Sequence, residues 1–272
     1  YSPARVAKGD NSSNVVERAI EYWNGDEGKR GIVTLCWHWC PAARYDKSKS
    51  DPWGTFYTDK TKFNLARAMN GSDPDGYQML LDDIDAIAVQ LKRLQDADVP
   101  VLWRPLHEAS GGWFWWGASG ADAYLQLYKL MYERLTNVHG LNNLIWVWNG
   151  QDAAWYPGDE YVDIIGEDIY PGKHVYTSQA ARFIKALSYT DTRKLITLSE
   201  NGCIPDPEQL VRDNIMWSYW CVWEGEFVLK AAGFNNYSEQ YTEKNMLKKA
   251  YKSDTVITRK ELPDLRNYPL GD

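Results

Sequence analysis

The sequence predicts an α/β fold, a (β/α)8 TIM barrel in which parallel strands alternate with helices. Two observations predict it. Short, unbroken apolar runs alternate along the chain with segments whose apolar residues recur at the helical period. Polar and aromatic residues follow directly after several of these runs, where a barrel carries its active site. A length of 272 residues suits one such unit, so we expect residues 1–272 to form a single domain.

The first half of the chain carries three predicted strands. They rest on runs such as LIWVW at 144–148, because strands buried on both faces need no polar alternation. The segment 81–97 carries Ile84, Ile87 and Leu91 at helical spacing and is a predicted helix. In chain order the predicted elements are helix 15–23, strand 31–37, helix 81–97, strand 99–103, helix 122–138 and strand 144–148.

The second half continues the alternation with three more strands. Its predicted elements are strand 162–166, helix 178–187, strand 194–198, strand 215–223 and helix 238–251. The six predicted strands are two fewer than a barrel of this type contains. An open doubly wound sheet would accommodate six strands. The polar residues at the ends of the strands favour the barrel.

Charge and composition exclude several classes of protein. The formal charge is −7 and the isoelectric point is about 5.2. This balance argues against nucleic-acid binding and against a polybasic membrane anchor. No run of 18 apolar residues is present, so we expect no membrane-spanning helix. The dinucleotide fingerprint, the nucleophile elbow and the phosphate loop are missing as well.

The four cysteines give little indication of disulfide bonds or of a metal site. Cys36, Cys40, Cys203 and Cys221 make a poor disulfide framework for a chain of this length, and they leave the redox compartment open. A structural zinc site requires two pairs of Cys or His ligands at matching spacing. We therefore expect no metal and no cofactor.

Aromatic residues are the compositional surplus, with 14 Trp, 18 Tyr and 6 Phe making 14% of the chain. We interpret Trp146 and Trp148 as residues of the core or barrel wall. The run WFWW at 113–116 stands between glycines, so we expect a shaped surface loop rather than core packing. Such rings can stack on the apolar faces of sugars.

Two glutamates stand where strands end. Glu108 comes soon after strand 99–103 and Glu200 just after strand 194–198. A lone glutamate of this kind is more often a solvated loop residue, and a histidine between two tryptophans, such as His38, is more often a core residue. Two strand-end glutamates surrounded by rings instead fit glycoside hydrolysis by an acid and a nucleophile. We also expect period-two alternation to point Arg104 and Glu108 to the same side of their strand.

Acidic residues elsewhere have plainer interpretations. Asp82, Asp83 and Asp85 stand where helix 81–97 is predicted to begin. We interpret them as solvated residues that the helix dipole favours.

Four motifs together resemble glycoside hydrolase family 26. They are RPLHEASGGWFWWG at 104–117, LSENG at 198–202, TLCWHW at 34–39 and GEDIYPG at 166–172. The resemblance covers residues 1–262, and the motif around Glu108 is highly specific. It implies a retaining endo-β-1,4-mannanase built as a (β/α)8 barrel. It also implies that the first two barrel strands lie upstream of Tyr1, which would account for the count of six.

The resemblance also assigns roles. Glu108 is similar to the family's general acid/base and Glu200 to its nucleophile. The other matching positions are His107, which tunes the nucleophile or binds sugar; Arg104, which supports the carboxylates; and the sugar-binding shell of His38, Trp113, Tyr170 and Trp223. The two carboxyl groups need divergent pKa values, raised at Glu108 by tryptophans and kept low at Glu200 by hydrogen bonds. The family resemblance further implies a secreted monomer acting on mannan, galactomannan or glucomannan without a cofactor.

Alternatives stay open at this level. The motifs also resemble the mixed-linkage β-glucanases and β-1,3-xylanases of the same family. The residues after Glu108 do not fix which polysaccharide is bound. A non-catalytic carbohydrate-binding protein on a degenerate barrel is a different class. The presence of both glutamates argues against it.

Overall fold

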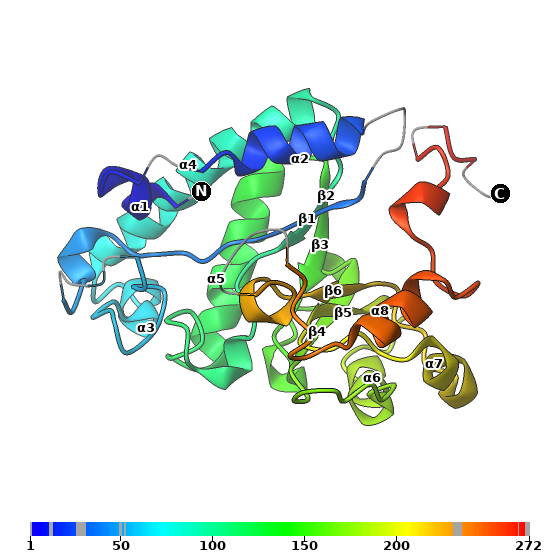
Figure 1. Cartoon of the computed structure of the whole chain (residues 1–272). Helices are drawn as coiled ribbons and strands as arrows, with labels where there is room; N and C mark the ends of the chain where they lie inside the picture. Colours follow the sequence, from blue (N-terminus) through cyan, green and yellow to red (C-terminus); the bar gives the residue numbers. More distant parts are fainter. Residues whose placement is uncertain are drawn as a thin grey trace. The chain divides into compact units, whose positions relative to one another are not determined.

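The protein is described by a computed structural model that covers residues 2–10, 13–25, 31–48, 51, 53–230, 236–265 and 267–269 (Figure 1). Its contacts divide it into two compact units, Tyr1–Asp163 and Ile164–Asp272. Each unit is an alternation of parallel strands and helices, and each is described by itself. No helix in the described residues is both long and apolar enough to span a membrane.

The first unit contains three parallel strands in the order of the sequence. They are β1 (Val33–Cys36), β2 (Val101–Arg104) and β3 (Leu144–Trp148). Val33 is opposite Val101 in the register, and Val101 is opposite Leu144. β2 is buried along its whole length, which is why its sequence shows no polar alternation. All three strands predicted for this half of the chain are confirmed: 144–148 matches β3 at both ends, and the ends of the other two are shifted by one or two residues.

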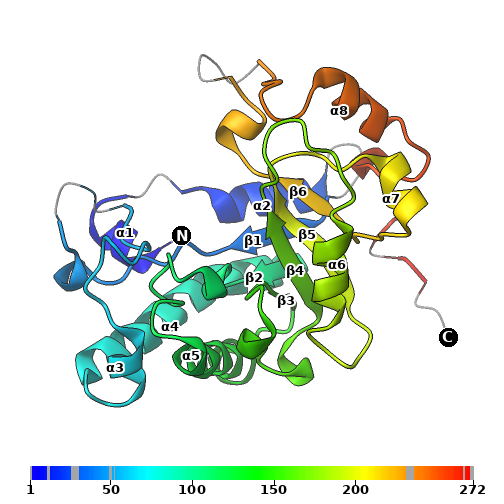
Figure 2. The same cartoon turned by 90° about the horizontal axis from the view of Figure 1, so that it is seen from below.

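Two long helices lie next to each other beside these strands (Figure 2). They are α4 (Pro74–Asp96) and α5 (Ala121–Glu133), and a π-helical turn, η3 (Arg134–Val138), continues α5. Asp85 on α4 ties the two together, because it accepts hydrogen bonds from both Nε and Nη2 of Arg134 at 2.5 Å. The remaining helices of this unit are α1 (Pro3–Ala7), α2 (Val15–Asn24), α3 (Leu65–Met69), η1 (Ala43–Tyr45), η2 (Ala109–Gly111), η4 (Ala153–Trp155) and η5 (Asp159–Tyr161).

The start of α4 corrects the interpretation of the acidic residues Asp82, Asp83 and Asp85. The side chain of Asp73 caps the helix by accepting from the backbone N–H of Gly76, and Pro74 occupies the first turn. The helix therefore begins seven residues earlier than the apolar pattern predicts. The three aspartates lie in its interior rather than at its positive end. Asp83 in particular is buried, at 8% exposure, so the expectation of a solvated residue is wrong there.

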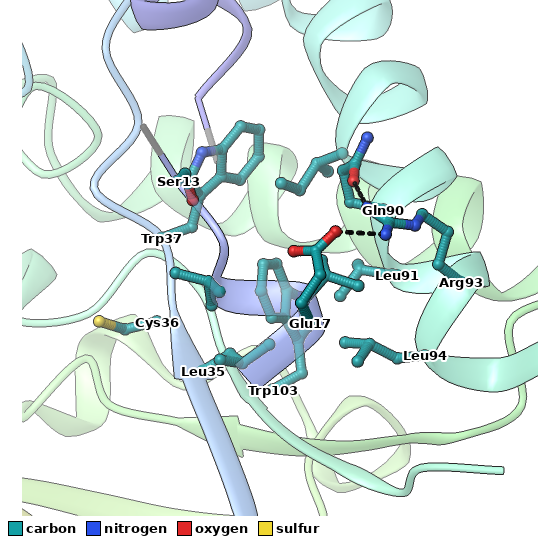
Figure 3. Close-up of a pocket in the computed structure, with 13 residues that line it drawn as sticks. Ser13, Glu17, Leu35, Cys36, Trp37, Gln90, Leu91, Arg93, Leu94 and Trp103 are labelled. Carbon is teal, nitrogen blue, oxygen red and sulfur yellow. Dashed lines mark hydrogen bonds and ion pairs between the residues drawn. The ribbon is translucent and has the colours of Figure 1, made fainter. Parts of the chain in front are cut away.

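A small pocket of about 60 Å³ lies in the first unit among α2, α4, β1 and β2 (Figure 3). Most of its lining is apolar, including Leu35, Leu91 and Leu94. An ion pair closes part of its rim, with 2.5 Å between Arg93 Nη2 and Glu17 Oε1. Glu108 does not line it. We regard this pocket as a packing gap under α2.

The second unit repeats the architecture of the first. Its parallel strands are β4 (Ile164–Ile169), β5 (Leu195–Asn201) and β6 (Trp220–Val222). Its helices are α6 (Ala180–Leu187), α7 (Pro207–Asp213), α8 (Lys244–Tyr251), η6 (Gly225–Phe227) and η7 (Arg259–Glu261), and α6 contacts both β4 and β5. β5 runs three residues beyond its predicted end. β6 is much shorter than predicted, because residues 215–219 form no strand.

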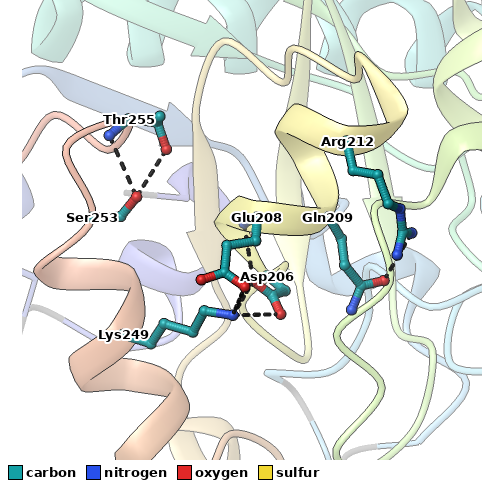
Figure 4. A network of polar contacts seen from close by, with 7 residues as sticks. All are labelled: Asp206, Glu208, Gln209, Arg212, Lys249, Ser253 and Thr255. Carbon is teal, nitrogen blue, oxygen red and sulfur yellow. Dashed lines mark hydrogen bonds and ion pairs between the residues drawn. The ribbon is translucent and has the colours of Figure 1, made fainter.

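An ionic cluster joins α7 to α8 (Figure 4). Lys249 on α8 lies 2.8 Å from a carboxylate oxygen of Asp206 and 2.8 Å from one of Glu208. Asp206 also caps α7, because its side chain accepts from the backbone N–H of Glu208. The cluster fixes α8 to the segment that follows β5.

Candidate active site

Glu108 lies on an irregular turn that begins where β2 ends. Arg104 is the last residue of the strand, and both Leu106 and Glu108 have left-handed backbones, with φ of 53° and 52°. This conformation is uncommon for residues other than glycine and concentrates at functional sites. The expectation that strand alternation aligns Arg104 with Glu108 is wrong, because the strand does not reach Glu108. The turn sets the direction of the glutamate instead.

Asn149 holds this turn in place. The backbone N–H of Glu108 donates to the Asn149 carbonyl at 2.7 Å, and Arg104 Nη1 donates to the Asn149 side-chain oxygen at 2.8 Å. Arg104 and Asn149 are both buried, at 3% and 0% exposure. Arg104 therefore supports Glu108 through Asn149. Sequence reasoning missed Asn149, although its place directly after the run LIWVW was a usable signal.

The ring of Trp113 lies beside the carboxylate of Glu108. Its Nε1 donates to Glu108 Oε2 at 2.9 Å, and the ring remains 45% exposed. The rest of the WFWW run is different, because Phe114, Trp115 and Trp116 are all buried. The expectation that the whole run is a surface loop for sugars is therefore wrong. Only Trp113 offers a ring face, and the other three rings pack inside the unit, as Trp146 and Trp148 do.

His38 and His107 lie together, with their ring centres 4.8 Å apart and the rings nearly perpendicular. His107 is buried and His38 is partly exposed. Burial, reinforced by the positive charges of Arg104 and His38, holds the pKa of His107 well below its usual range. His107 is therefore neutral at ordinary pH and can act only as a hydrogen-bonding group.

The buried carboxylate of Asp83 forms a hydrogen bond with Trp39, the residue after His38. Asp83 Oδ2 accepts from Trp39 Nε1 at 2.7 Å, and Trp39 stacks on Trp37 with ring centres 4.2 Å apart. Burial raises the pKa of Asp83 from 3.8 to about 6, although the hydrogen bond from Trp39 opposes the rise. The ionised carboxylate is therefore disfavoured in the folded protein.

We expect the Asp83→Asn variant to gain stability as the pH rises. Asp83 binds its proton more tightly in the folded state, so its contribution is fully present below pH 3.8 and is lost as the pH passes 6. Asparagine keeps the acceptor for Trp39 and cannot ionise. Its free energy of unfolding should exceed that of the wild type by an amount that grows by up to about 3 kcal/mol from pH 4 to pH 8. Urea denaturation at both pH values measures this difference.

The exposed neighbour Asp82 provides the matched control, since Asp82→Asn on the same helix should change little at either pH. A difference between Asp83→Asn and wild type that is equal at pH 4 and pH 8 would contradict the expectation.

In the second unit Glu200 is the sixth residue of β5 and is 4% exposed. The hydroxyl of Tyr170, just past the end of β4, donates to Glu200 Oε2 at 2.5 Å. The structure therefore brings together two of the predicted residues, a buried strand-end carboxylate and the tyrosine that binds it.

Asp168 is a further carboxylate that the sequence did not single out. It is opposite Glu200 in the register of β4 and β5, and carboxylate oxygens of the two residues lie within 4.8 Å. Ser199 Oγ donates to Asp168 Oδ1 at 2.6 Å. A usable signal was its position at the end of a buried strand, one residue before Ile169 and two before Tyr170.

The neighbouring Glu167 has a structural environment instead. It is fully buried, and it accepts from Arg182 Nε on α6 and from the Tyr189 hydroxyl, both at 2.9 Å. A register irregularity between Glu167 and Asp168 separates the two carboxylates. Glu167 therefore anchors α6 to the sheet, while Asp168 lies beside Glu200.

Trp223 directly follows β6 and is partly exposed. Its backbone N–H donates to the carbonyl of Asn201 at 2.9 Å, which sets it beside the end of β5. The ring of Tyr170 is 42% exposed and packs on Gly202. The predicted residues of this unit, Tyr170, Glu200 and Trp223, thus occur at the carboxyl ends of three successive strands. That is where parallel α/β sheets carry their sites.

Comparison with known proteins identifies the family of the chain. The model of glycosyl hydrolase family 26 matches residues 1–261. A mannan endo-1,4-β-mannosidase of Thermothelomyces thermophilus is 44% identical over 263 residues, which are 96% of this chain and 52% of that protein. Mannan endo-1,4-β-mannosidase A of a Piromyces species is 38% identical over 250 residues, 92% of this chain and 38% of that protein. The chain thus spans about half or less of the length of these curated relatives.

Solved structures give the same result. The crystal structure of a Podospora anserina GH26-CBM35 β-(1,4)-mannanase superposes with a TM-score of 0.85 at 40% identity, covering 96% of this chain and 56% of that one. A β-mannanase from a symbiotic protist of the termite Reticulitermes speratus, complexed with gluco-manno-oligosaccharide, has a TM-score of 0.78 at 36% identity. That match covers 92% of this chain and 72% of that one. On these matches the chain belongs to glycosyl hydrolase family 26.

Proposed function

We propose that the protein is a retaining endo-β-1,4-mannanase that hydrolyses internal β-1,4-mannosidic bonds of mannan, galactomannan or glucomannan. The observation that carries the proposal is the environment of Glu200, a buried strand-end carboxylate bound by the hydroxyl of an exposed tyrosine. Membership of the family and relatives that are named as mannan endo-1,4-β-mannosidases support the choice of substrate. In this proposal residues 1–272 form a single catalytic domain.

The reaction proceeds by double displacement. A carboxylate oxygen of Glu200 attacks the anomeric carbon and forms a glycosyl ester. The bond to the leaving oxygen breaks at the same time, and that oxygen takes the proton of Glu108. Glu108, now ionised, removes a proton from water, whose oxygen attacks the anomeric carbon and releases Glu200. Two inversions leave the configuration unchanged.

The neighbouring side chains have supporting roles in this scheme. The hydrogen bond from Trp113 Nε1 orients the carboxyl group of Glu108, and the exposed face of the same ring is available to the sugar. Arg104 and Asn149 keep the Glu108 turn in place. His38, Tyr170 and Trp223 bind the reacting mannose, and neutral His107 donates or accepts a hydrogen bond there.

A substrate panel with product analysis tests the proposal. We expect rapid release of short oligosaccharides from galactomannan and glucomannan, and little from lichenan or β-1,3-xylan. Proton NMR of the first product should show the β-anomer before mutarotation. Faster release from lichenan would identify a mixed-linkage β-glucanase, and faster release from β-1,3-xylan would identify a β-1,3-xylanase. An initial α-anomer would mean inversion, which requires carboxyl groups roughly 6.5–9.5 Å apart rather than about 5–5.5 Å.

We expect the Tyr170→Phe variant to lose about 10- to 100-fold in kcat. The substitution keeps the ring but removes one hydrogen bond to the nucleophile, and a bond to a charged group contributes about 1.5–3 kcal/mol. Steady-state hydrolysis of mannohexaose measures the loss. Tyr251→Phe, on an exposed face of α8, is the control that should keep full activity. An unchanged kcat in Tyr170→Phe would remove Tyr170 from the mechanism.

Secretion and a monomeric state are part of the same proposal. A polysaccharide is too large to enter a cell, so an enzyme that cleaves internal bonds acts outside it. Size-exclusion chromatography with light scattering should give a mass near that of one chain, 31.3 kDa. A mass of twice this value would contradict the monomer.

A further inference from the structure

A row of three aromatic rings leads away from Glu200 in the second unit. Tyr170, which binds Glu200, contacts Phe227 with ring centres 5.3 Å apart. Phe227 also contacts Tyr241, with ring centres 4.3 Å apart and an angle of 40° between the ring planes. All three rings are at least partly exposed. The mechanism described above uses only the first of them.

The segments that carry these rings are fixed to one another. The backbone N–H of His174 donates to the carbonyl of Tyr241 at 3.0 Å. The thiol of buried Cys203 lies 2.9 Å from the Gly172 carbonyl and 3.1 Å from the Tyr241 carbonyl. A Cβ added at Gly202 would approach Phe227 to 3.1 Å. The row is therefore held by the backbone around it, and the rings need little further ordering to receive a ligand.

Polar groups surround the far end of the row. Glu226 accepts from Gln240 Nε2 at 2.9 Å and from the Tyr241 hydroxyl at 3.3 Å. Lys173 Nζ lies 5.7 Å from the centre of the Tyr241 ring. Glu226, Gln240 and Lys173 are all exposed. Partly exposed ring faces beside a few convergent donors and acceptors are the composition of a ligand site.

We propose that Phe227 and Tyr241 form a further binding subsite for a hexopyranose unit of a β-linked glycan. Pyranose rings present C–H faces that pack on aromatic rings, and their hydroxyls suit the carboxylate, amide and ammonium groups at the rim. The row starts at the tyrosine that binds the nucleophile, so a glycan bound there continues along it. This inference rests on the proposed function, because it extends the same substrate beyond the reacting sugar.

The opposing interpretation is that Phe227 and Tyr241 bind no sugar and only hold the ring of Tyr170 in position. The two interpretations differ in how substrate length matters. A subsite away from the reacting sugar raises kcat/KM only for glycans long enough to reach it. Residues that only position Tyr170 affect kcat/KM for every substrate alike.

The experiment compares mannotriose and mannohexaose. We expect Tyr241→Ala and Phe227→Leu to lower the ratio of kcat/KM for mannohexaose to that for mannotriose by about tenfold each, the equivalent of one aromatic contact. Phe227→Leu keeps apolar bulk against Gly202 while removing the ring. Tyr241→Phe keeps the ring and should restore most of the ratio. Tyr251→Ala, exposed on α8, is the matched control for the loss of a tyrosine.

Thermal melting of each variant shows that it is folded. An equal loss on both substrates, or an unchanged ratio in folded variants, would overturn the subsite. A second measurement keeps the subsite separate from the proposed function. Titration calorimetry of the Glu200→Ala protein with mannohexaose should show about tenfold weaker binding when Tyr241→Ala is added. If the wild type hydrolyses no β-glycan, the proposed function fails while this binding difference still decides the subsite.

Discussion

Hydrolysis of galactomannan is expected to fall on the order of 10⁴-fold or more when Glu200 is replaced by alanine, because no group remains to form the glycosyl ester. The substitution removes a carboxylate that is 4% exposed and leaves the Tyr170 hydroxyl without this acceptor. Reducing-sugar release with the purified variant measures the loss. Oligosaccharide binding should remain measurable by calorimetry, because the exposed ring of Tyr170 and the partly exposed Trp223 are unchanged.

The matched control is Glu208→Ala in the same unit. Glu208 is 80% exposed and forms an ion pair with Lys249 at the surface, and such pairs contribute little to stability. This variant should hydrolyse galactomannan at the wild-type rate. Normal turnover by Glu200→Ala would refute the nucleophile assignment. Loss of both turnover and mannohexaose binding, together with a lowered melting temperature, would mean that the substitution had unfolded the site.

Replacing Glu108 with alanine should slow hydrolysis by an amount that depends on the leaving group of the substrate. A natural sugar alkoxide needs a proton to leave, and general acid catalysis contributes about 10²–10⁴-fold. An activated aryl mannoside leaves without that proton. We therefore expect hydrolysis of mannohexaose to fall by that factor, while formation of the glycosyl ester from a dinitrophenyl mannobioside changes much less. A burst of dinitrophenol followed by slow turnover should reveal the ester that accumulates.

Azide supplies a second test of the same residue. Azide ion needs no general base, so it should attack the accumulated ester in Glu108→Ala, raise turnover and give a mannosyl azide of unchanged configuration. The wild type should give no such product. Glu21→Ala, on the exposed face of α2, is the control that should behave like the wild type. Equal losses on the natural and the activated substrate would show that Glu108 is not the acid.

Much of this fold could be predicted from the sequence. Unbroken apolar runs identified all six strands of the described residues, and the matches to solved family structures confirm the predicted (β/α)8 fold class. The ends of elements were harder to predict. Helix α4 begins at a proline and a capping aspartate that lie outside its apolar stripe. β6 begins five residues later than predicted, because the run that predicts it starts in residues 215–219, which form no strand.

The site was predictable in its residue types but not in its geometry. Glu200 and its strand could be placed from the run that precedes it. The turn of Glu108 could not, because left-handed backbone at Leu106 and Glu108 is imposed by tertiary contacts such as those of Asn149. The rings of the WFWW run were misjudged for a related reason. Flanking glycines indicate a turn, but they do not indicate which side chains of the turn face inward.

The left-handed backbone of Leu106 and Glu108 also bears on how this protein could be engineered for the proposed activity. Each such residue costs of order 1–3 kcal/mol, which the rest of the fold must offset. Selection for thermal stability alone would favour substitutions that relax this turn and so move the carboxyl group it aims. Stability and activity are therefore in conflict at this turn. Stabilising substitutions are better sought far from it, for instance at exposed helix positions, and each should be screened for turnover as well as for melting temperature.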